Sequence, residues 1–230
     1  MILETVSTGS ANGNCYLLHS ESGMVLILDC GVSPIQIKKA INFDLKSVAG
    51  VLVTHGHNDH CKAAEKLARY GLNVWKPYES DATVRKKKFK KKFLVQSFPL
   101  PHNGTENRGF FIRADGQRLL YMTDFEYCPY TFKKQEIQHM LIECNYSDDE
   151  ADKEIPNWEH KVLGHASLGT VKRFIEINRT PELQNIILCH MGQRLDHNKA
   201  IEEIQKAAGP GVSVRFAKPG KRIELKDIPF

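Results

Sequence analysis

Residues 51–60 read Val51-Leu-Val-Thr-His55-Gly-His57-Asn-Asp59-His60, which places three histidines and a carboxylate within six residues, directly after an apolar run. Side chains alternate along a strand, so His55 and His57 would emerge on the same side. A helix that starts near Asp59 would turn this carboxylate and His60 toward a second position. Imidazole and carboxylate groups are ligands for zinc and similar first-row metals. The stretch therefore predicts a site for two metal ions.

Four more short motifs contain or follow apolar runs. In chain order they are Leu26-Ile-Leu-Asp29-Cys-Gly31, Pro99-Leu-Pro-His102-Asn, Leu120-Tyr-Met-Thr-Asp124 and Ile186-Ile-Leu-Cys-His190-Met-Gly. Together with the histidine-rich stretch, this series resembles the metallo-β-lactamase superfamily from about residue 5 to residue 205. The resemblance implies an α/β protein with a four-layer αββα sandwich, in which the site lies at one edge of two paired sheets.

The resemblance also assigns the metal ligands. The first ion would be held by His55, His57 and His102, and the second by Asp59, His60 and His190, with Asp124 bridging both. Asp29 would support the ligands from behind. Two such ions, zinc or alternatively manganese, would lower the pKa of a shared water and stabilise the charge that develops in a displacement.

Two finer motifs favour the phosphodiesterase and nuclease branch of the superfamily. Gly164-His165-Ala-Ser167 is similar to a motif of that branch in which the histidine acts near the metals, and the resemblance makes Asp59 and His165 catalytic. A histidine at a helix N-terminus would lie among free N–H donors, which suit phosphate, and it can donate a proton near neutral pH. The alternative is that His165 is only a surface histidine at a helix start.

The second motif is Leu141-Ile-Glu143-Cys-Asn145-Tyr-Ser. With the compact length of the chain, it resembles a single-domain bacterial group associated with 5′-exonuclease activity. Cys144, Tyr146 and Ser147 depart from that group's pattern, which puts the role of a missing histidine in doubt. The opening Ser7-Thr-Gly-Ser-Ala-Asn-Gly-Asn14 also resembles the group's first loop, whose amides would approach a substrate, although a plain hairpin loop is the alternative.

The lysine segment, residues 85–92, is the most basic part of the chain. It carries seven cations in eight residues: Arg85, Lys86, Lys87, Lys88, Lys90, Lys91 and Lys92. Without them the 32 basic residues of the chain become 25 against 27 acidic ones, so the net charge of +5 comes from this segment. Such a concentration predicts nucleic-acid binding near the site entrance, with Phe89 stacking on a base. The alternative is a solvated loop or an edge strand whose lysines block pairing.

Composition and periodicity agree with one domain over residues 1–230. The chain is 41% hydrophobic, which supports a substantial core, and it holds no apolar stretch long enough to span a membrane. We expect strands at 14–18, 24–28, 110–112, 119–122 and 141–143, and helices at 35–41, 63–68, 168–175 and 201–208. The start lacks a signal-peptide pattern and the six cysteines form no C-x-x-C pair, so we expect reduced thiols in a cytoplasmic protein.

The sequence thus predicts a dinuclear metal-dependent phosphodiesterase, foremost a nuclease that hydrolyses DNA or RNA through a metal-bound hydroxide. The alternative enzyme is a small-molecule hydrolase, either a cyclic-nucleotide phosphodiesterase or a thioesterase/lactonase. A nucleic-acid-binding protein with a decayed site is less consistent with a complete ligand set. The expected partner is a nucleic acid or nucleotide substrate; a homodimer, the exo or endo mode of cleavage and the metal identity stay open.

Overall fold

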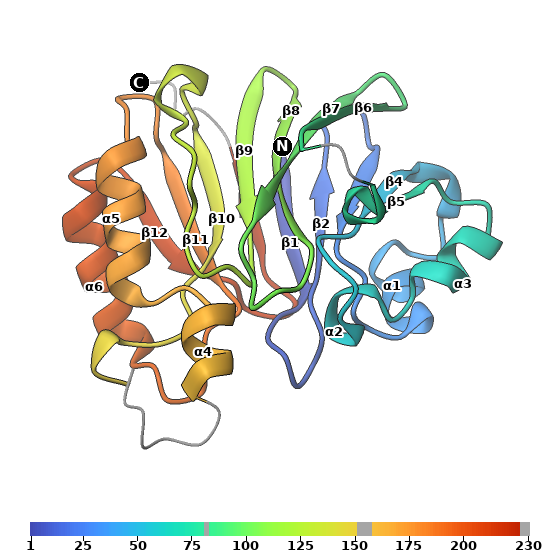
Figure 1. The fold of residues 1–230 in the computed structure, drawn as a ribbon. Helices are drawn as coiled ribbons and strands as arrows, with labels where there is room; N and C mark the ends of the chain where they lie inside the picture. Colours follow the sequence, from blue (N-terminus) through green and yellow to red (C-terminus); the bar gives the residue numbers. More distant parts are fainter. Residues whose placement is uncertain (81–82, 151–157, 226–230) are drawn as a thin grey trace.

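Two β-sheets stack face to face in the computed structural model, which describes residues 1–80, 83–150 and 158–225 (Figure 1). The six-stranded sheet has the order β13 (Arg222–Glu224), β1 (Ile2–Ser7), β2 (Cys15–His19), β3 (Val25–Leu28), β4 (Val48–Leu52) and β5 (Val74–Trp75). The seven-stranded sheet has the order β12 (Ser213–Phe216), β11 (Asn185–Cys189), β10 (His139–Glu143), β9 (Gln117–Met122), β8 (Asn107–Ala114), β7 (Phe93–Leu100) and β6 (Arg85–Phe89). Strands β3 to β5 are parallel, as are β9 to β12, and the other neighbours are antiparallel.

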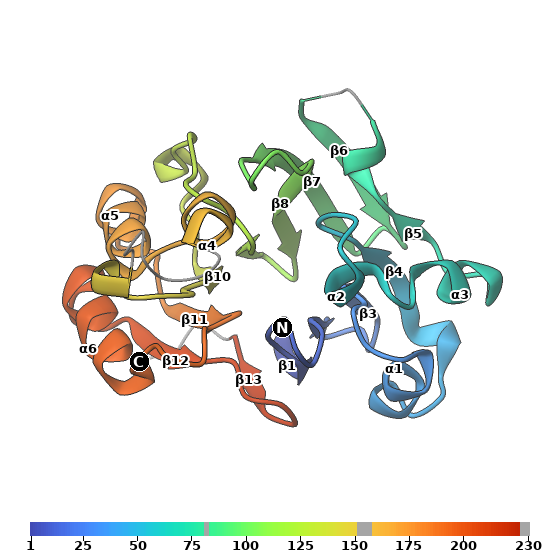
Figure 2. The same ribbon diagram turned by 60° about the horizontal axis from the view of Figure 1, so that its bottom comes forward.

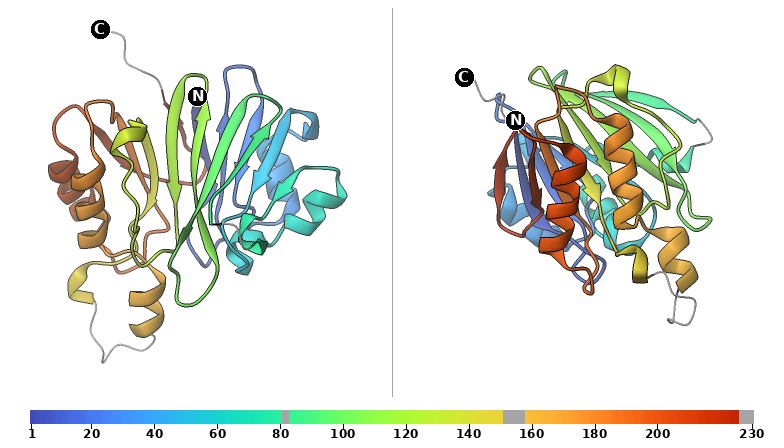
Figure 3. Two further views of the ribbon diagram at one scale, coloured as in Figure 1. Left: turned by 45° about the horizontal axis from the view of Figure 1, so that its top comes forward. Right: turned by 90° about the vertical axis from the view of Figure 1, so that its left-hand side faces the viewer.

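Helices cover the outer face of each sheet, which gives the four-layer αββα sandwich that the sequence predicted (Figures 2 and 3). The α-helices are α1 (Pro34–Ala40), α2 (Asn58–Cys61), α3 (Ala64–Arg69), α4 (Trp158–Gly164), α5 (Leu168–Asn178) and α6 (His197–Ala208), and short 3₁₀ turns lie at Leu45–Ser47, Pro77–Glu79, Lys133–Gln135 and Asp148–Glu150. Helices α1 and α3 pack on the six-stranded sheet, whereas α5 and α6 pack on the seven-stranded sheet.

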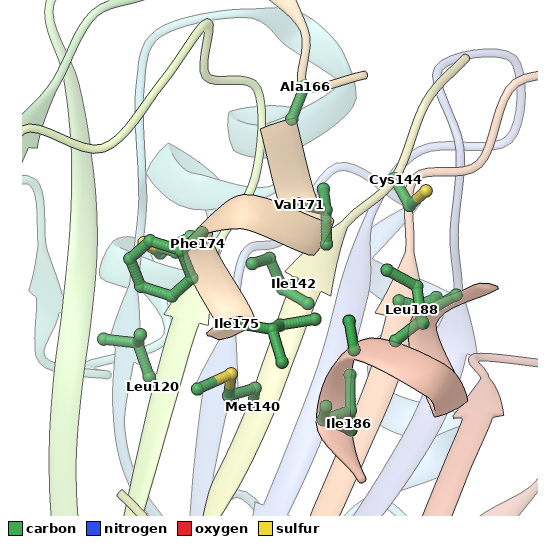
Figure 4. Packing of buried hydrophobic residues seen from close by; sticks show 14 of the residues in the cluster. Leu120, Met140, Ile142, Cys144, Ala166, Val171, Phe174, Ile175, Ile186 and Leu188 are labelled. Carbon is green, nitrogen blue, oxygen red and sulfur yellow. The ribbon is translucent and has the colours of Figure 1, made fainter. Parts of the chain in front are cut away.

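Three apolar layers hold these four layers together. The central layer lies between the sheets, and two outer layers lie between each sheet and its helices. On α5, Val171, Phe174 and Ile175 recur at helical spacing and point into the same layer as Met140 and Ile142 of β10 (Figure 4). The strands β10 and β11 are buried along their whole length because they are covered on both faces.

The ends of the strands bring the predicted motifs to one edge of the sandwich. Strands β7, β9, β10 and β11 point the same way, because β7 and β9 are both antiparallel to β8 and β9 to β11 are parallel. The residues that follow these strands therefore gather at one end, and the loop after β4 reaches the same end from the other sheet. This convergence positions His102, Asp124 and His190 opposite residues 55–60.

The expected elements are present, with strands that extend beyond several of the expected bounds. Strand β8 covers Asn107–Ala114 instead of 110–112, and β10 starts at His139. Helix α1 starts with Ser33 and Gln36 in a reciprocal capping box and Pro34 in the first turn. Within the described residues, no helix has both the length and the apolar character needed to cross a membrane.

Candidate metal centre

A first group of potential ligands comes from three different parts of the chain. His55 and His57 follow β4, His102 follows β7 and Asp124 follows β9, and one ligand atom of each lies within 4.8 Å of the others. His57 Nδ1 is 3.3 Å from His102 Nε2, and His55 Nε2 is 3.4 Å from Asp124 Oδ2. A tetrahedral zinc ion with bonds of about 2.0–2.1 Å separates its ligand atoms by roughly 3.3 Å. These two separations match the spacing that such an ion needs, and the remaining ones lie within 4.8 Å.

A second group adjoins the first and shares Asp124 with it. It consists of Asp59 and His60 on α2, Asp124, and His190 after β11. His60 Nε2 is 3.1 Å from Asp124 Oδ2 and 3.4 Å from Asp59 Oδ2. The same Asp124 oxygen thus faces His55 in one group and His60 in the other. This position between the two groups suits a carboxylate that bridges two ions through one oxygen.

Hydrogen bonds fix the orientation of three of these imidazoles. The Nδ1–H groups of His102, His60 and His190 donate to the Gly164 carbonyl at 2.7 Å, the Asp29 carboxylate at 2.7 Å and the Glu143 carboxylate at 2.7 Å. Each ring therefore presents its Nε2 lone pair to the cluster. Such supporting acceptors orient metal-binding histidines and raise their basicity.

Asp29 is buried and receives several donors at once. Its carboxylate accepts hydrogen bonds from the Thr54 backbone N–H at 2.8 Å, from the Tyr121 hydroxyl at 2.6 Å and from His60. Asp29 ties β3, β4 and β9 together beneath the cluster. The structure thus places Asp29 behind a potential ligand, as expected, and adds Thr54 and Tyr121 as groups that hold it.

Three of the predicted residues lie in left-handed backbone conformations one or two residues after the end of a strand. The φ angles are 55° at Asp29, 51° at Asp124 and 47° at His190. Non-glycine residues rarely adopt this conformation, which costs roughly 1–2 kcal/mol, and such positions cluster at functional sites. Each one ends its strand abruptly and turns the side chain toward the edge of the sandwich.

The position of α2 is set by close backbone contacts with the loops that flank it. The Asp59 carbonyl accepts from the Asn14 N–H at 2.7 Å, and the His60 carbonyl accepts from the Cys30 N–H at 2.8 Å. A Cβ atom on Gly31 would lie 1.7 Å from the Asp59 carbonyl oxygen. Only glycine leaves room for this approach, so the Asp29-Cys-Gly31 motif places two ligands as well as supplying Asp29.

The electrostatics of the cluster suit a metal. Burial and the neighbouring His60 hold the pKa of His55 well below its usual value, and the buried His55 Nε2 has no hydrogen-bond partner within the described residues. Burial opposes ionisation of Asp124, but His190 and His60 outweigh it and hold its pKa well below the usual range. A neutral imidazole with an unused lone pair beside a carboxylate is the donor set of a zinc-like site. The residues therefore fit a metal.

A third acidic and histidine group lies beside the second. The Glu143 Oε1 atom accepts from the Nδ1–H groups of His190 at 2.7 Å and His165 at 2.8 Å, while Oε2 accepts from the N–H groups of Phe125 and Ala166. Glu143 is buried, and its neighbour His165 helps to hold its pKa below the usual value against the effect of burial. Because all four of these groups donate to Glu143, we interpret it as an orienting carboxylate and not as a metal ligand.

His165 lies next to the cluster. The sequence places it at the start of a helix, but in the structure it lies between two helices. It follows α4, and Ser167 is the cap of α5. Burial opposes protonation of His165, yet Glu143 outweighs it and raises the pKa of His165. The N-terminus of α5 is already occupied, because the Asp148 carboxylate accepts from the Gly169 N–H at 2.8 Å. The prediction that free helix N–H groups bind phosphate here is therefore wrong.

A cleft of about 540 Å³ opens beside His165 and His190. The first loop, residues 8–12, forms one wall, and residues 191–194 with α4 form the others. Ser10 Oγ lies 3.0 Å from His190 Nε2, and Asn14 Nδ2 lies 3.0 Å from His60 Nε2. The loop therefore reaches the ligands themselves. Lys161 and Arg194 line the cleft, and no carboxylate does so within the part of the chain that the structure describes.

The lysine segment does not join this site. Residues 85–89 form the edge strand β6, one of the alternatives, and residues 90–92 form the turn into β7. Ten residues separate Lys92 from His102 along β7, about 30 Å at the rise of a strand, so the turn lies at the far end of the sheet (Figure 1). Phe89 is only 1% exposed and packs in the central layer, so it cannot stack on a base. The expectations that the segment lies near the site entrance and that Phe89 stacks on a base are therefore wrong, whereas nucleic-acid binding by the lysines stays a prediction.

Sequence reasoning assigned no contact with the metal-ligand histidines to Glu143, Ser10, Asn14 or Thr54, although the first three lie in motifs that it singled out. Glu143 had a signal, because it is an acid that closes the apolar strand β10 just as Asp124 follows β9. Ser10 and Asn14 lie in a loop whose contacts depend on residues more than 40 positions away, and no local pattern reveals that. The six cysteines are unpaired, and none belongs to a candidate metal group among the described residues.

Comparisons with known proteins agree with this geometry. The model of the metallo-beta-lactamase superfamily matches residues 8–126. The anti-Pycsar protein Apyc1 of Bacillus phage 010DV004 is 39% identical over 79 residues, and the hydroxyacylglutathione hydrolase of Baumannia cicadellinicola subsp. Homalodisca coagulata is 34% identical over 94 residues. These alignments cover 32% and 36% of this chain, and the chain spans about a third of the length of these relatives, 31% and 36%.

Solved structures share the fold over nearly the whole chain. The metallo-beta-lactamase fold protein YhfI from Bacillus subtilis superimposes with a TM-score of 0.71 at 14% identity, covering 96% of this chain and 98% of that one. The short form of human tRNase Z gives a TM-score of 0.64 at 16% identity, covering 99% of this chain and all of the other. At such identities the likeness concerns the fold.

Proposed function

Because this chain belongs to the metallo-beta-lactamase superfamily, whose members are metal-dependent hydrolases, we propose that it is a dinuclear metal-dependent phosphodiesterase, foremost a nuclease. The observation that carries the proposal is His165, held by the buried Glu143 at the mouth of the cleft beside the metal ligand candidates. A hydrolase that acts on thioesters or lactones has less need of a second acid at this place. The resemblance of the chain's motifs to the compact 5′-exonuclease-like group leads us to place a nuclease first.

His55, His57, His102 and Asp124 would hold one ion, and Asp59, His60, Asp124 and His190 the other. Metals at these positions would supply an activated water and stabilise charge at the phosphorus. Zinc suits the imidazole-rich first group, and manganese is the alternative where carboxylates contribute more.

His165 would act on the leaving oxygen. Its Nδ1–H donates to Glu143, so the Nε2 atom is the nitrogen available to a substrate in the cleft. The raised pKa of His165 favours the protonated imidazole, which is the form that can donate a proton. Glu143 would keep the ring oriented and stabilise its charge, because the same carboxylate is buried and fully hydrogen-bonded.

The cleft favours an anionic substrate. Lys161 and Arg194 line it, and Asn145 adds a neutral amide. Lys161 also pairs with Glu150 at 2.6 Å, which fixes the Lys161 side chain and partly offsets its charge. Cationic walls attract phosphate groups and offset the charge of a phosphodiester.

A cyclic-nucleotide or other small-molecule hydrolase is the second candidate. The cleft volume of about 540 Å³ supports it, since it falls within the 300–1,000 Å³ that is usual for small-ligand sites. A cyclic nucleotide would use the same metals and the same proton donor. Because the chain is similar to a hydroxyacylglutathione hydrolase, a thioester should be included as a third substrate in any test.

The proposal is tested with His165→Ala on two diesters that differ in the leaving group. The leaving group of a natural dinucleotide is a nucleoside alkoxide that needs a proton, so turnover of this substrate should fall by roughly 10²–10⁴-fold. The leaving group of a nitrophenyl diester is nitrophenolate, a stable anion that needs no proton, so turnover of this substrate should fall tenfold or less. His160→Ala is the matched control, since this exposed histidine lines the same cleft and should have a small effect on both substrates. No loss on either substrate with His165→Ala would remove the support for a phosphodiesterase.

A further inference from the structure

Part of the seven-stranded sheet has an outer face that no helix covers. Helices α5 and α6 pack over β10 to β12, and β6 to β8 lie beyond them (Figure 2). On this uncovered face the register aligns Lys88 with Leu94 and Leu94 with Arg113, and it aligns Lys86 with Gln96. Lys86, Lys88 and Arg113 are exposed. Alternation along each strand puts these side chains on one side of the sheet.

Two shallow hollows run across the same face and meet at Arg113. One is lined by Lys86, Leu94, Gln96, Phe111 and Arg113, and the other by Arg113, Arg118, Lys134 and Glu136 among its residues. We call Lys86, Lys88, Arg113, Arg118 and Lys134 the open basic face. Glu136 and Glu182 approach Arg118 at 3.9 and 4.0 Å, so that cation is partly neutralised, but the face keeps a positive balance.

The rest of the lysine segment points elsewhere. Lys87 lies on the inner side of β6, where its Nζ is 2.9 Å from Asn73 Oδ1 and 5.2 Å from the centre of the Phe89 ring. Lys90 and Lys91 form the turn with φ angles of 47° and 56°. Arg113 instead stacks its guanidinium 5.1 Å from the centre of the Phe111 ring, which holds the charge over the sheet.

We propose that the open basic face binds the phosphate backbone of a single-stranded nucleic acid whose scissile bond lies in the metal centre. The face and the site share one strand, because Gln96 lies on the face and His102 follows β7 six residues later. Between them Phe98 is buried beneath Tyr130 and Phe132, so the nucleic acid would cross over this segment to reach the site. Six residues of strand span about 20 Å, which is about six nucleotides at the 3.4 Å spacing of a stacked strand. This inference rests on the proposed function for its substrate, and it adds a second contact remote from the cleavage point.

The first test measures binding without rapid turnover. Fluorescence anisotropy of a labelled single-stranded 20-mer is recorded with metal-replete His165→Ala protein, and then with Lys86→Gln, Lys88→Gln and Arg113→Gln added together. We expect binding to weaken at least tenfold at low salt. We also expect the slope of log affinity against log salt to fall by about 2, because three contacts release fewer counterions.

Two controls separate position from total charge. Lys39→Gln, Lys46→Gln and Lys66→Gln remove the same charge from exposed sites near α1 and α3 and should change affinity less than twofold. Arg113→Lys in the otherwise unchanged open basic face keeps the charge and should retain most of the binding even if Arg113→Gln weakens the fold. Equal losses in the open-face and the remote triple variants would overturn the proposal.

The second test varies substrate length in the protein that retains His165. The open-face triple variant should lower kcat/KM about tenfold on a 20-mer and leave cleavage of a dinucleotide unchanged, since a dinucleotide does not reach the face. An equal loss on both lengths would overturn the inference. If the protein with an intact open basic face cleaves no diester, the proposed function is refuted. The anisotropy measurement would then still test whether the open basic face binds nucleic acid. The proposal would also be overturned if the protein bound phosphatidylglycerol vesicles more tightly than the 20-mer and the open-face triple variant lost this binding. That result would assign the open basic face to membrane binding.

Discussion

Residues 55–60 lie at the metal end of the sandwich, whereas residues 85–92 run from the middle of β7 to the turn at the far end of the sheet. The side chains of the two segments behave in opposite ways. Those of His55, His57, Asp59 and His60 converge with three residues from other strands, so that the candidate ligand atoms of each metal group lie within 4.8 Å of one another. Those of the lysine segment diverge onto the outer face, the inner face and the turn of one hairpin. Each segment is rich in one type of functional group, metal-ligand side chains in residues 55–60 and cations in residues 85–92.

The difference lies in what the surrounding fold supplies. At the metal end, Asp29, Glu143 and Gly164 present acceptors that fix the imidazoles, and the close approach at Gly31 fixes α2. At the hairpin end, strand alternation and the inward packing of Phe89 set the directions, and among the described residues no buried acceptor gathers the lysines. A local run becomes a site when distant parts of the chain orient it.

The largest expected effect concerns Asp124, the residue that both candidate metal groups share. Asp124→Ala should reduce metal content at both positions and lower diesterase activity by more than about 10⁴-fold, because the activated water and the charge stabilisation are each worth several kcal/mol. Elemental analysis against protein concentration measures the content. His190→Ala is the control and should remove mainly the second ion. Two ions retained by Asp124→Ala would contradict the bridging role.

A smaller loss is expected at Glu143, which orients a ligand without binding metal itself. Glu143→Gln should weaken metal affinity at the second position and activity by about 10–100-fold, since the His190 and His165 rings lose a shared acceptor. Metal titration by competition with a chelator gives the affinity. Asp148→Asn is the matched control, because Asp148 caps α5 nearby and should cost only about 0.5–2 kcal/mol of stability. Identical metal affinities in the two variants would contradict our account.

The sequence predicted the sandwich, which the structure confirms. It also brought out the seven candidate ligands, because most of them follow an apolar strand, which is a local signal, and because their series resembles the superfamily. Glu143 also ends such a strand, yet its partners become apparent only when β10 lies beside β9 and β11. The Asp148 contact that occupies the start of α5 depends on a residue 21 positions earlier. The directions of the lysines depend on which face of β6 packs inward, and that is settled by Phe89 and Trp75 in the central layer. Long-range pairing of this kind has no local pattern.

The smallest expected effect concerns the hairpin turn itself. Lys90 and Lys91 occupy left-handed positions, whereas the β8–β9 hairpin uses Asp115 and Gly116 there, with φ angles of 51° and 73°. Lys90→Asn with Lys91→Gly should stabilise the fold by about 0.5–1 kcal/mol, since asparagine and glycine suit such turns. Thermal unfolding should shift upward by about 1–4 °C, with turnover of a dinucleotide unchanged. A change in turnover would show that the hairpin end is coupled to the metal end.

The most direct test of the central claim is a substrate panel with metal-replete protein. Single-stranded DNA and RNA, a dinucleotide, a cyclic nucleotide and a chromogenic thioester are compared, with and without a chelator. We predict that phosphodiesters are hydrolysed, that the chelator abolishes this activity, and that added zinc or manganese restores it. Metal-dependent cleavage of the thioester with no cleavage of any phosphodiester would contradict the account.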